Sequence, residues 1–417
     1  MGEPERALLA IDGDLRGGLE EMHLQAGLGI SRMYLHGGRD TQPALARSLE
    51  IAEHRGDPVD QLKVLGPLNM FYLRTGDFNS ALQCARQCSS IAEKSQDPGI
   101  VALGHFFLGN SLHFTGNLAP ARLELEAAVR GDPLPHRTPA SYVGFQGRGL
   151  AGGILARNLW LQGFPDQADD RARQTIKETA EADHSLTLCI ALLGGIAVFL
   201  WRGDLQIAQE HIDWLISRAG LHSLSPYVSV ARGFEGELAI RRGDLSGGVS
   251  SLRRCIEKLH ASTYEVFTTM LELSLIKGLA ALGQLDESMT RLEKAKQSVE
   301  ANGDLCYMPE LLRMAANLSP SMPASYVQGL LLEALDTSRK MGAHGWELRV
   351  ATDLAAFMNA RGARSDANGL LKSVFDHFHE GLDTEDLSVA KHLLADLSGR
   401  TERLHRTRRE TIDALKE

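Results

Sequence analysis

The segment WRGDLQIAQEH, at residues 201–211, returns in outline as RRGDLSGGVSS at residues 241–251, forty positions later. The triplet Arg-Gly-Asp occurs four times in the chain, beginning at Arg55, Arg130, Arg202 and Arg242. This tripeptide is known from cell adhesion, so the question is whether it marks an adhesion protein or an architectural turn. The spacing of the glycines along the chain answers it.

Short turns with a central glycine recur at a nearly constant interval. The glycines are Gly76, Gly116, Gly163, Gly203, Gly243 and Gly283, separated by 40, 47, 40, 40 and 40 residues. A further turn glycine, Gly362, follows 79 residues later, which is close to two periods. The intermediate turn falls near Ser321, where two prolines would end a helix. Similarity at a fixed period of this size is typical of a repeat architecture.

Each repeat is predicted to be two helices joined at its glycine. Apolar-periodic segments such as ALGHFFLGNSLHF and LAPARLELEAAV lie before and after the turn. Glycine ends a helix in the left-handed conformation at little cost, because it has no Cβ. An Asp or Asn in the next position can accept hydrogen bonds from the free N–H groups of the second helix; these residues are Asp77, Asn117, Asp204 and Asp244. The triplets at Arg202 and Arg242 are therefore interpreted as turns.

A small residue stands five positions after each turn glycine. These residues are Ala81, Ala121, Ala168, Ala208, Gly248, Ser288 and Ala367. A small side chain at a fixed point lets the two helices of a hairpin approach closely. The pattern is that of tetratricopeptide-like hairpins, and the best single match is LGNSLHFTGNLAPARLELEAAVRGDP at residues 108–133.

These regularities predict an all-α, right-handed superhelix, or solenoid, of about eight tetratricopeptide-like hairpins with a period of ~40 residues. Hairpins are expected over residues 1–130 and 154–397. Between them, residues 131–153 are rich in Pro and Gly and are expected to form an irregular joint, while residues 398–417 form a charged tail.

Composition narrows the classes of function. The net charge of −9 argues against direct nucleic-acid binding, which needs a basic face. The basic run RTERLHRTRR lies in the tail and is interpreted as a solvated helix end. The N-terminal residues lack an apolar signal core, no run of about 18 apolar residues predicts a membrane span, and the five cysteines are too scattered for a disulfide framework. A cytoplasmic protein is expected.

No motif in the sequence predicts catalysis. Gly147, Gly149 and Gly152 form a literal G-x-G-x-x-G, but no strand precedes it, so a dinucleotide site is not expected. A weaker hypothesis is an anion site at Arg148 and Gly149, at a glycine-rich helix start. Neither a G-x-x-x-x-G-K-[ST] loop nor an H-E-x-x-H motif occurs. The chain is predicted to be non-enzymatic, without cofactor or catalytic metal.

The remaining candidate site is the concave face of the superhelix, which the first helix of each tetratricopeptide-like hairpin lines. Counting back from the turn glycines predicts a set of inward-facing residues: Asn110, His113, Arg157, Trp160, Trp201, Glu237, Arg241 and Lys277. Trp and Arg are frequent anchors of recognition surfaces, so these residues could bind a protein partner or a small effector. Alternatively, the two tryptophans pack between hairpins.

Three segments carry a resemblance to a known group of proteins. They are ILARNLWLQGFPDQADDRA at 154–172, GELAIRRGDLSGGVSSLR at 236–253, and the stretch from GAHGWELRVATDL to HLLADL at 342–397. They resemble the C-terminal repeat region of bacterial regulators that join a winged-helix or class III adenylate/guanylate cyclase domain to a P-loop ATPase.

The winged-helix, cyclase and ATPase parts have no counterpart in this sequence. The resemblance therefore implies a sensor or partner-binding module of a bacterial signal-transduction or transcription-regulatory system. The alternative is the regulatory repeat part of a cyclase or ATPase system that acts with a separately encoded catalytic chain.

Overall fold

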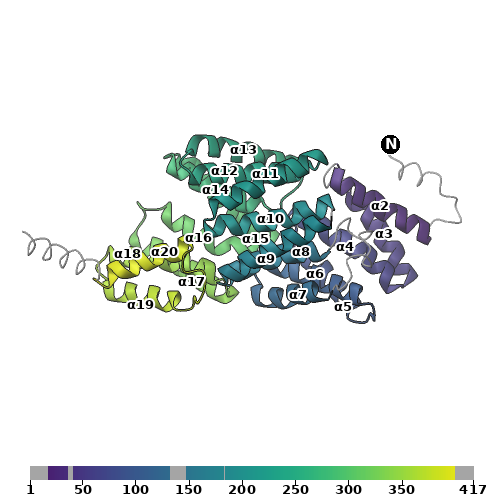
Figure 1. Ribbon diagram of the computed structural model, residues 1–417, viewed down its shortest axis with the longest axis horizontal. Coiled ribbons are helices and arrows are strands. Elements are labelled where there is room, and N and C mark those ends of the chain that lie inside the picture. Colours follow the sequence, from purple (N-terminus) through teal and green to yellow (C-terminus); the bar gives the residue numbers. More distant parts are fainter. Residues whose placement is uncertain (1–16, 36–40, 132–146, 183, 400–417) are drawn as a thin grey trace, which may run out of the picture.

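A computed structural model describes residues 17–35, 41–131, 147–182 and 184–399, and these residues form paired α-helices without a strand (Figure 1). The pairs are α2 (Leu19–Leu35) with α3 (Thr41–Arg55), α4 (Pro58–Thr75) with α5 (Phe78–Ala92), α6 (Pro98–Phe114) with α7 (Leu118–Arg130), α8 (Gly147–Leu161) with α9 (Pro165–Glu181), α10 (Ser185–Arg202) with α11 (Leu205–Leu221), α12 (Ser225–Arg241) with α13 (Leu245–Ala261), α14 (Thr268–Ala281) with α15 (Leu285–Asn302), α16 (Met308–Asn317) with α17 (Ala324–Met341), and α18 (His344–Asn359) with α19 (Arg364–Phe375). A short 3-10 helix, η3 (Leu305–Tyr307), precedes α16, and α20 (Glu385–Leu397) ends the described chain.

The predicted all-α repeat fold is confirmed. The nine described pairs exceed the predicted eight by one, because α2 and α3 lie before the first turn glycine. Every predicted turn glycine has a left-handed backbone, with φ from 75° at Gly283 to 96° at Gly243. The joint was predicted to end at residue 153, but α8 already begins at Gly147. Residues 132–146 of the joint and 400–417 of the tail lie outside the described residues.

The predicted helix caps form in two of the four turns. The carboxylate of Asp77 accepts a hydrogen bond from Ser80 N at 2.9 Å, and that of Asp244 accepts one from Gly247 N at 3.0 Å. Asp204 makes no cap, and its carboxylate instead pairs with the guanidinium of Arg202, Nε to Oδ2 at 2.9 Å. A neighbouring cation therefore competes with the helix N-terminus for the same oxygen atoms.

The small residues after the turns are buried within their hairpins. Ala81, Ala121, Ala168, Ala208, Ser288 and Ala367 are all fully buried. At the seventh position, an added Cβ on Gly248 would lie 2.6 Å from the backbone oxygen of Gly236 on the partner helix. The close approach predicted from the sequence is therefore present.

A leucine at one of these positions is expected to destabilise the chain. Ala121→Leu should lower the free energy of unfolding by about 1–3 kcal/mol, because extra methyl groups must force α7 away from α6. Ala119→Leu is the control on the same helix, since Ala119 is exposed and the larger side chain meets solvent. Chemical denaturation of both variants measures the difference, and equal stabilities would contradict the packing role of Ala121.

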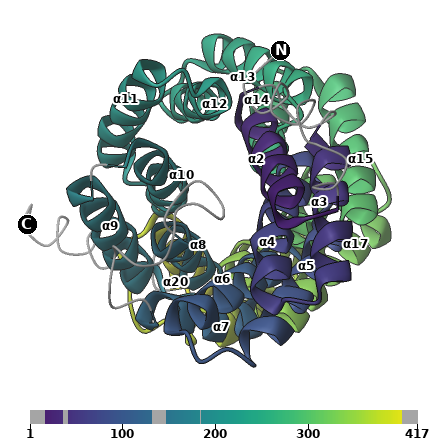
Figure 2. The same ribbon diagram turned by 90° about the vertical axis from the view of Figure 1, so that its right-hand side faces the viewer.

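The hairpins wind into a ring (Figure 2), and later hairpins return to pack against the turns of earlier ones, as at Gly163, which faces His344. The loop after α13 contacts the end of α4, where Glu265 N donates a hydrogen bond to Arg74 O at 2.6 Å. Further along, the carboxylate of Asp166 on α9 accepts a hydrogen bond from Gly381 N at 2.8 Å. One hydrophobic core extends from Met33 to Leu397. The hairpins before and after the joint therefore belong to one packed body.

Helix α10 packs against α8, α9, α11 and α12. Its 18 residues are long and apolar enough, by length and composition, to cross a membrane, although the sequence analysis found no such run. In the structure 83% of that segment is buried inside the protein. A Cβ on Gly194 would lie 2.8 Å from the Cα of Gly153, so α10 and α8 meet backbone to backbone. The apolar run is explained by burial on all sides within the array.

Candidate functional site: the inner face of the superhelix

The structure places six of the eight predicted inward-facing residues in the interior. Asn110, His113, Arg157, Trp160, Trp201 and Glu237 are buried, whereas Arg241 is half-buried and Lys277 is exposed. Later elements of the chain cover several of them: Tyr307 hydrogen-bonds to Arg157, and Trp346 packs on Trp160 and Trp201. The expectation that all eight residues are accessible to a ligand is therefore wrong for the six buried ones.

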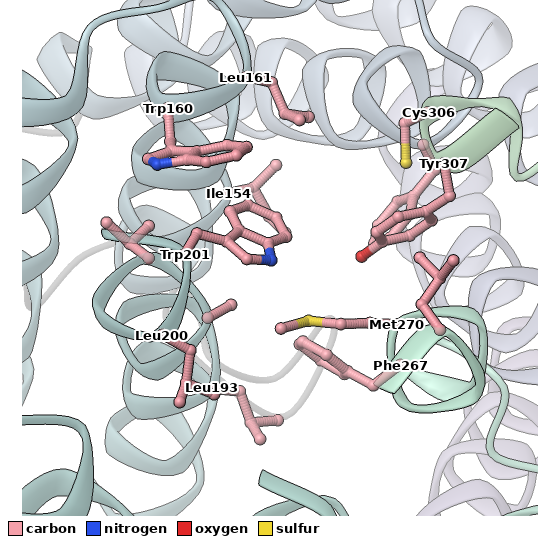
Figure 3. Close-up of a cluster of buried hydrophobic side chains, with 14 of the residues drawn as sticks. Ile154, Trp160, Leu161, Leu193, Leu200, Trp201, Phe267, Met270, Cys306 and Tyr307 are labelled. Carbon is pink, nitrogen blue, oxygen red and sulfur yellow. The ribbon is translucent and has the colours of Figure 1, made fainter. Parts of the chain in front are cut away.

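Trp160, Trp201 and Tyr307 form the aromatic centre of the inner face (Figure 3). Trp346 and Arg157 are buried beside them. The ring centroids of Trp160 and Trp201 are 4.8 Å apart, and that of Trp346 lies 5.1 Å from Trp160. Trp160 and Trp201 come from the first superhelical turn, and Trp346 comes from α18 in the second. The tryptophans therefore pack between elements, as the alternative interpretation proposed.

Arg157 is a fully buried cation in this centre. Its Nη2 donates a hydrogen bond to the Tyr307 hydroxyl at 2.5 Å, while its Nε and Nη1 have no hydrogen-bond partner. The rings of Phe114 and Phe267 lie beside the guanidinium at 5.3 and 5.1 Å. Burial, assisted by the charge of Arg157, lowers the pKa of His113 well below its usual value. His113 is therefore a neutral interior residue.

Asn110 lies near this centre but lines a small apolar pocket of about 50 Å³. The pocket walls include Leu73 and Ile154, and the Oδ1 atom of Asn110 has no hydrogen-bond partner. Its size suits a few water molecules better than a ligand.

An open polar surface remains on the second half of the inner face. We call it the charged groove; it has a volume of about 290 Å³ and is lined by Arg241, Lys277, Arg313, Arg349, Thr352, Asp353, Glu385, Asp386 and Val389. Its four cations come one each from α12, α14, α16 and α18. Consecutive cations are 36 residues apart in the sequence, a step shorter than the 40-residue spacing of the turn glycines. They therefore lie nearer the starts of the later helices, from Arg241 at the end of α12 to Arg349 in the second turn of α18.

The charged groove is built on one buried anion. Glu310 is 1% exposed and receives Lys277 Nζ at 2.9 Å and Arg313 Nε at 2.7 Å, with Arg349 Nη1 at 3.5 Å. Burial acts to raise the pKa of Glu310, but the charges of Arg313 and Lys277 outweigh it and hold that pKa well below its usual value. Glu310 therefore stays ionised and orients three cations toward the groove.

The start of α20 supplies carboxylates to the two ends of this row of cations. Arg241 Nη1 pairs with Glu385 Oε2 at 3.1 Å, and Arg349 Nε pairs with Asp386 Oδ2 at 2.8 Å. Glu385 is 61% exposed, so its pair with Arg241 is a weak surface contact. The groove cations therefore bind carboxylates in the structure itself.

Glu237 does not line the charged groove but forms an ion pair with Arg241, which does. Its carboxylate pairs with Arg241 Nη2 at 3.0 Å and accepts a hydrogen bond from the Ser274 hydroxyl at 2.9 Å. It thereby joins the inner faces of α12 and α14.

Sequence reasoning found Arg241 and Lys277 but missed Arg313, Arg349 and Glu310. The count started from turn glycines, and the link from α16 to α17 has prolines in place of one. The constant 36-residue step from Lys277 onward is the signal that could have identified both arginines.

The candidate anion site at the start of α8 stays a prediction. Gly149 is buried there, and an added Cβ would lie 2.7 Å from both Thr179 and Thr187. The side chain of Arg148 lies outside the described residues.

The chain matches no protein-family model and no curated protein. Among solved structures it is similar to the Rap conjugation gene regulator of the plasmid pLS20 in complex with the Phr* peptide, with 11% identity over 85% of this chain and 93% of that chain and a TM-score of 0.51. A Rap protein complexed with competence and sporulation factor matches with 12% identity, 92% and 99% coverage and a TM-score of 0.49. A signal-transduction ATPase with a tetratricopeptide repeat sensor, from Pyrococcus horikoshii, matches with 10% identity over 91% of this chain and 55% of that chain, with a TM-score of 0.45. At these identities the comparison shows the tetratricopeptide-like repeat fold.

Proposed function

We propose that this chain is a non-catalytic, cytoplasmic binding module whose charged groove holds an acidic segment of a protein partner or a small acidic effector. The observation that supports this most is the row of Arg241, Lys277, Arg313 and Arg349, which the first helices of four successive hairpins present to one groove. An extended ligand along the row would contact several hairpins at once and favour one curvature of the superhelix.

The contacts of α20 indicate which ligand chemistry suits the groove. Because Glu385 and Asp386 already pair with Arg241 and Arg349, carboxylates have the right geometry for these guanidinium groups. Lys277 is the most exposed of the four cations, with 43% of its side chain accessible. A partner carboxylate can therefore reach Lys277 directly and replace the exposed Glu385 at Arg241.

A bacterial signal-transduction or transcription-regulatory system is the context we propose for this module. The resemblance of residues 154–172 and 342–397 to the repeat region of winged-helix and ATPase regulators supports it. The alternative is that the chain regulates a separately encoded cyclase or ATPase chain. It is tested by recovering complexes of this protein and assaying their nucleotide turnover. Inactivity of every recovered complex would remove that alternative.

Replacing the two accessible cations is expected to weaken binding of an acidic peptide. A fluorescent peptide with the sequence LDTEDLSVAK, which copies residues 382–391, serves as the probe. The Arg241→Ala/Lys277→Ala variant should bind it at least about tenfold more weakly than the unchanged chain, because two charge-assisted contacts are lost. Fluorescence anisotropy at low salt measures the affinities.

Two further variants make this test specific. Arg130→Ala/Lys340→Ala removes the same charge from exposed positions outside the groove, where the side chains are 70% and 75% accessible, and should leave the affinity unchanged. Glu385→Gln removes the internal competitor and should strengthen binding about two- to fivefold. Equal weakening by both double variants would show that only net charge matters and would contradict the groove assignment.

A further inference from the structure

A second and larger cavity lies between the two superhelical turns, separate from the charged groove. It has a volume of about 570 Å³, within the range of small-molecule sites. Gly76 and Phe78, at the turn between α4 and α5, form one side, and residues of α13, α14 and α15 form the other. We call it the inter-turn cavity.

Most charged groups of the inter-turn cavity already have partners. Arg291 Nη1 bonds to Glu272 at 3.0 Å, and its Nε bonds to Glu287 at 3.0 Å. Glu265 Oε1 lies 2.9 Å from His260 Nδ1. These pairs neutralise one another and form the walls of the cavity.

Asp304 is the exception among the carboxylates that line the inter-turn cavity. It is 1% exposed, its Oδ1 accepts the weak S–H of Cys306 at 3.5 Å, and its Oδ2 has no hydrogen-bond partner among the described residues. Burial raises the pKa of this carboxyl to about 6, against opposing effects of Thr269, Cys306 and the charge of Arg157. Burying a carboxylate oxygen without a hydrogen-bond donor costs folding free energy. A ligand that donates a hydrogen bond to Oδ2 would remove that cost.

We propose that the inter-turn cavity binds a small organic ammonium ion, such as an aliphatic diamine, with one ammonium group on the carboxylate of Asp304. Of the four carboxylates that line the cavity, Glu265, Glu272 and Glu287 are paired with basic side chains. Asp304 has no ion pair among the described residues, so it is the position where a cationic ligand is favoured.

The position of the cavity gives such a ligand a structural effect. It would contact the α4–α5 turn of the first superhelical turn and helices α14 and α15 of the second at the same time. Binding therefore stabilises the closed arrangement in which Glu265 N bonds to Arg74 O. This inference does not depend on the charged groove.

Calorimetric titration of the full chain with 1,4-diaminobutane dihydrochloride tests the proposal. The unchanged chain is expected to bind, and Asp304→Asn should bind at least about tenfold more weakly because the ionic hydrogen bond is lost. Asp304→Asn should fold with a melting temperature equal to or above that of the unchanged chain, since a buried, incompletely bonded carboxylate has been removed.

Two controls keep the test decisive. Glu293→Gln, on an exposed face of α15 outside the cavity, should bind the diamine normally. Ser298→Trp, at an exposed lining position, should block the cavity without altering Asp304. Absence of binding to the unchanged chain, unchanged affinity in Asp304→Asn and Ser298→Trp, or equal thermal stabilisation by magnesium chloride at matched ionic strength would each overturn the proposal.

Discussion

Replacing Glu310 by alanine is expected to lower the free energy of unfolding by about 3–5 kcal/mol, the cost of removing one partner from a buried ion network. Lys277, Arg313 and Arg349 all lie within 3.5 Å of its carboxylate. Without Glu310 their charges repel one another, and Arg313 keeps only Asp353, at 2.5 Å. Denaturant unfolding followed by circular dichroism measures the loss.

The pKa of Glu310 predicts how this effect depends on pH. Because the folded-state pKa lies well below its usual value, the stabilisation by Glu310 is complete above the pKa of an ordinary glutamate, about 4.3. It is lost as the pH falls through the lower, folded-state pKa. The stability difference between the unchanged chain and Glu310→Gln should therefore shrink in strong acid. A difference that is independent of pH would contradict the ionic role of Glu310.

Replacing Trp346 by alanine is expected to cost about 3–5 kcal/mol, because it empties a large volume where the two superhelical turns meet. Trp346 is 1% exposed, its ring contacts Trp160 and Trp201, and its Nε1 donates a hydrogen bond to Cys306 O at 2.9 Å. The variant should also expand, since contacts between α18 and the first turn are lost. Thermal unfolding and small-angle scattering measure these two effects.

Trp214→Ala is the matched control for this variant. Trp214 is 39% exposed on α11, so its truncation should cost less than half as much as that of Trp346, about 1–1.5 kcal/mol. Trp346→Phe retains most of the ring volume and isolates the hydrogen bond to Cys306 O. If Trp346→Ala were no more destabilising than Trp214→Ala, Trp346 could not be what joins the two turns.

The repeat fold could be predicted because its determinants are local. A left-handed glycine such as Gly203 and a small residue such as Ala208 act within one hairpin, and the same glycine turn and small buried residue recur in other hairpins. The caps were less predictable. The Asp204 carboxylate pairs with Arg202 and does not cap α11. The sequence alone does not show whether such a carboxylate binds a neighbouring cation or the N–H groups of the next helix.

The candidate site was predicted only in part, because long-range packing decides which inward residues stay accessible. Trp160 and Trp201 occupy the inner face, as expected from the glycine count, yet Trp346 lies against both from well over a hundred residues further along the chain. Lys277 also follows from the glycine count, and although it pairs with Glu310 of the next hairpin, 43% of its side chain stays accessible.

The sequence by itself determined the helical pairs and their close packing, since both follow from interactions within about forty residues. The tertiary structure alone decided that the second superhelical turn closes over the first. Small rotations between successive hairpins accumulate along the array, and no single repeat encodes their sum. That accumulated curvature buries Arg157 and Trp160, leaves the charged groove open and encloses Asp304 between the turns.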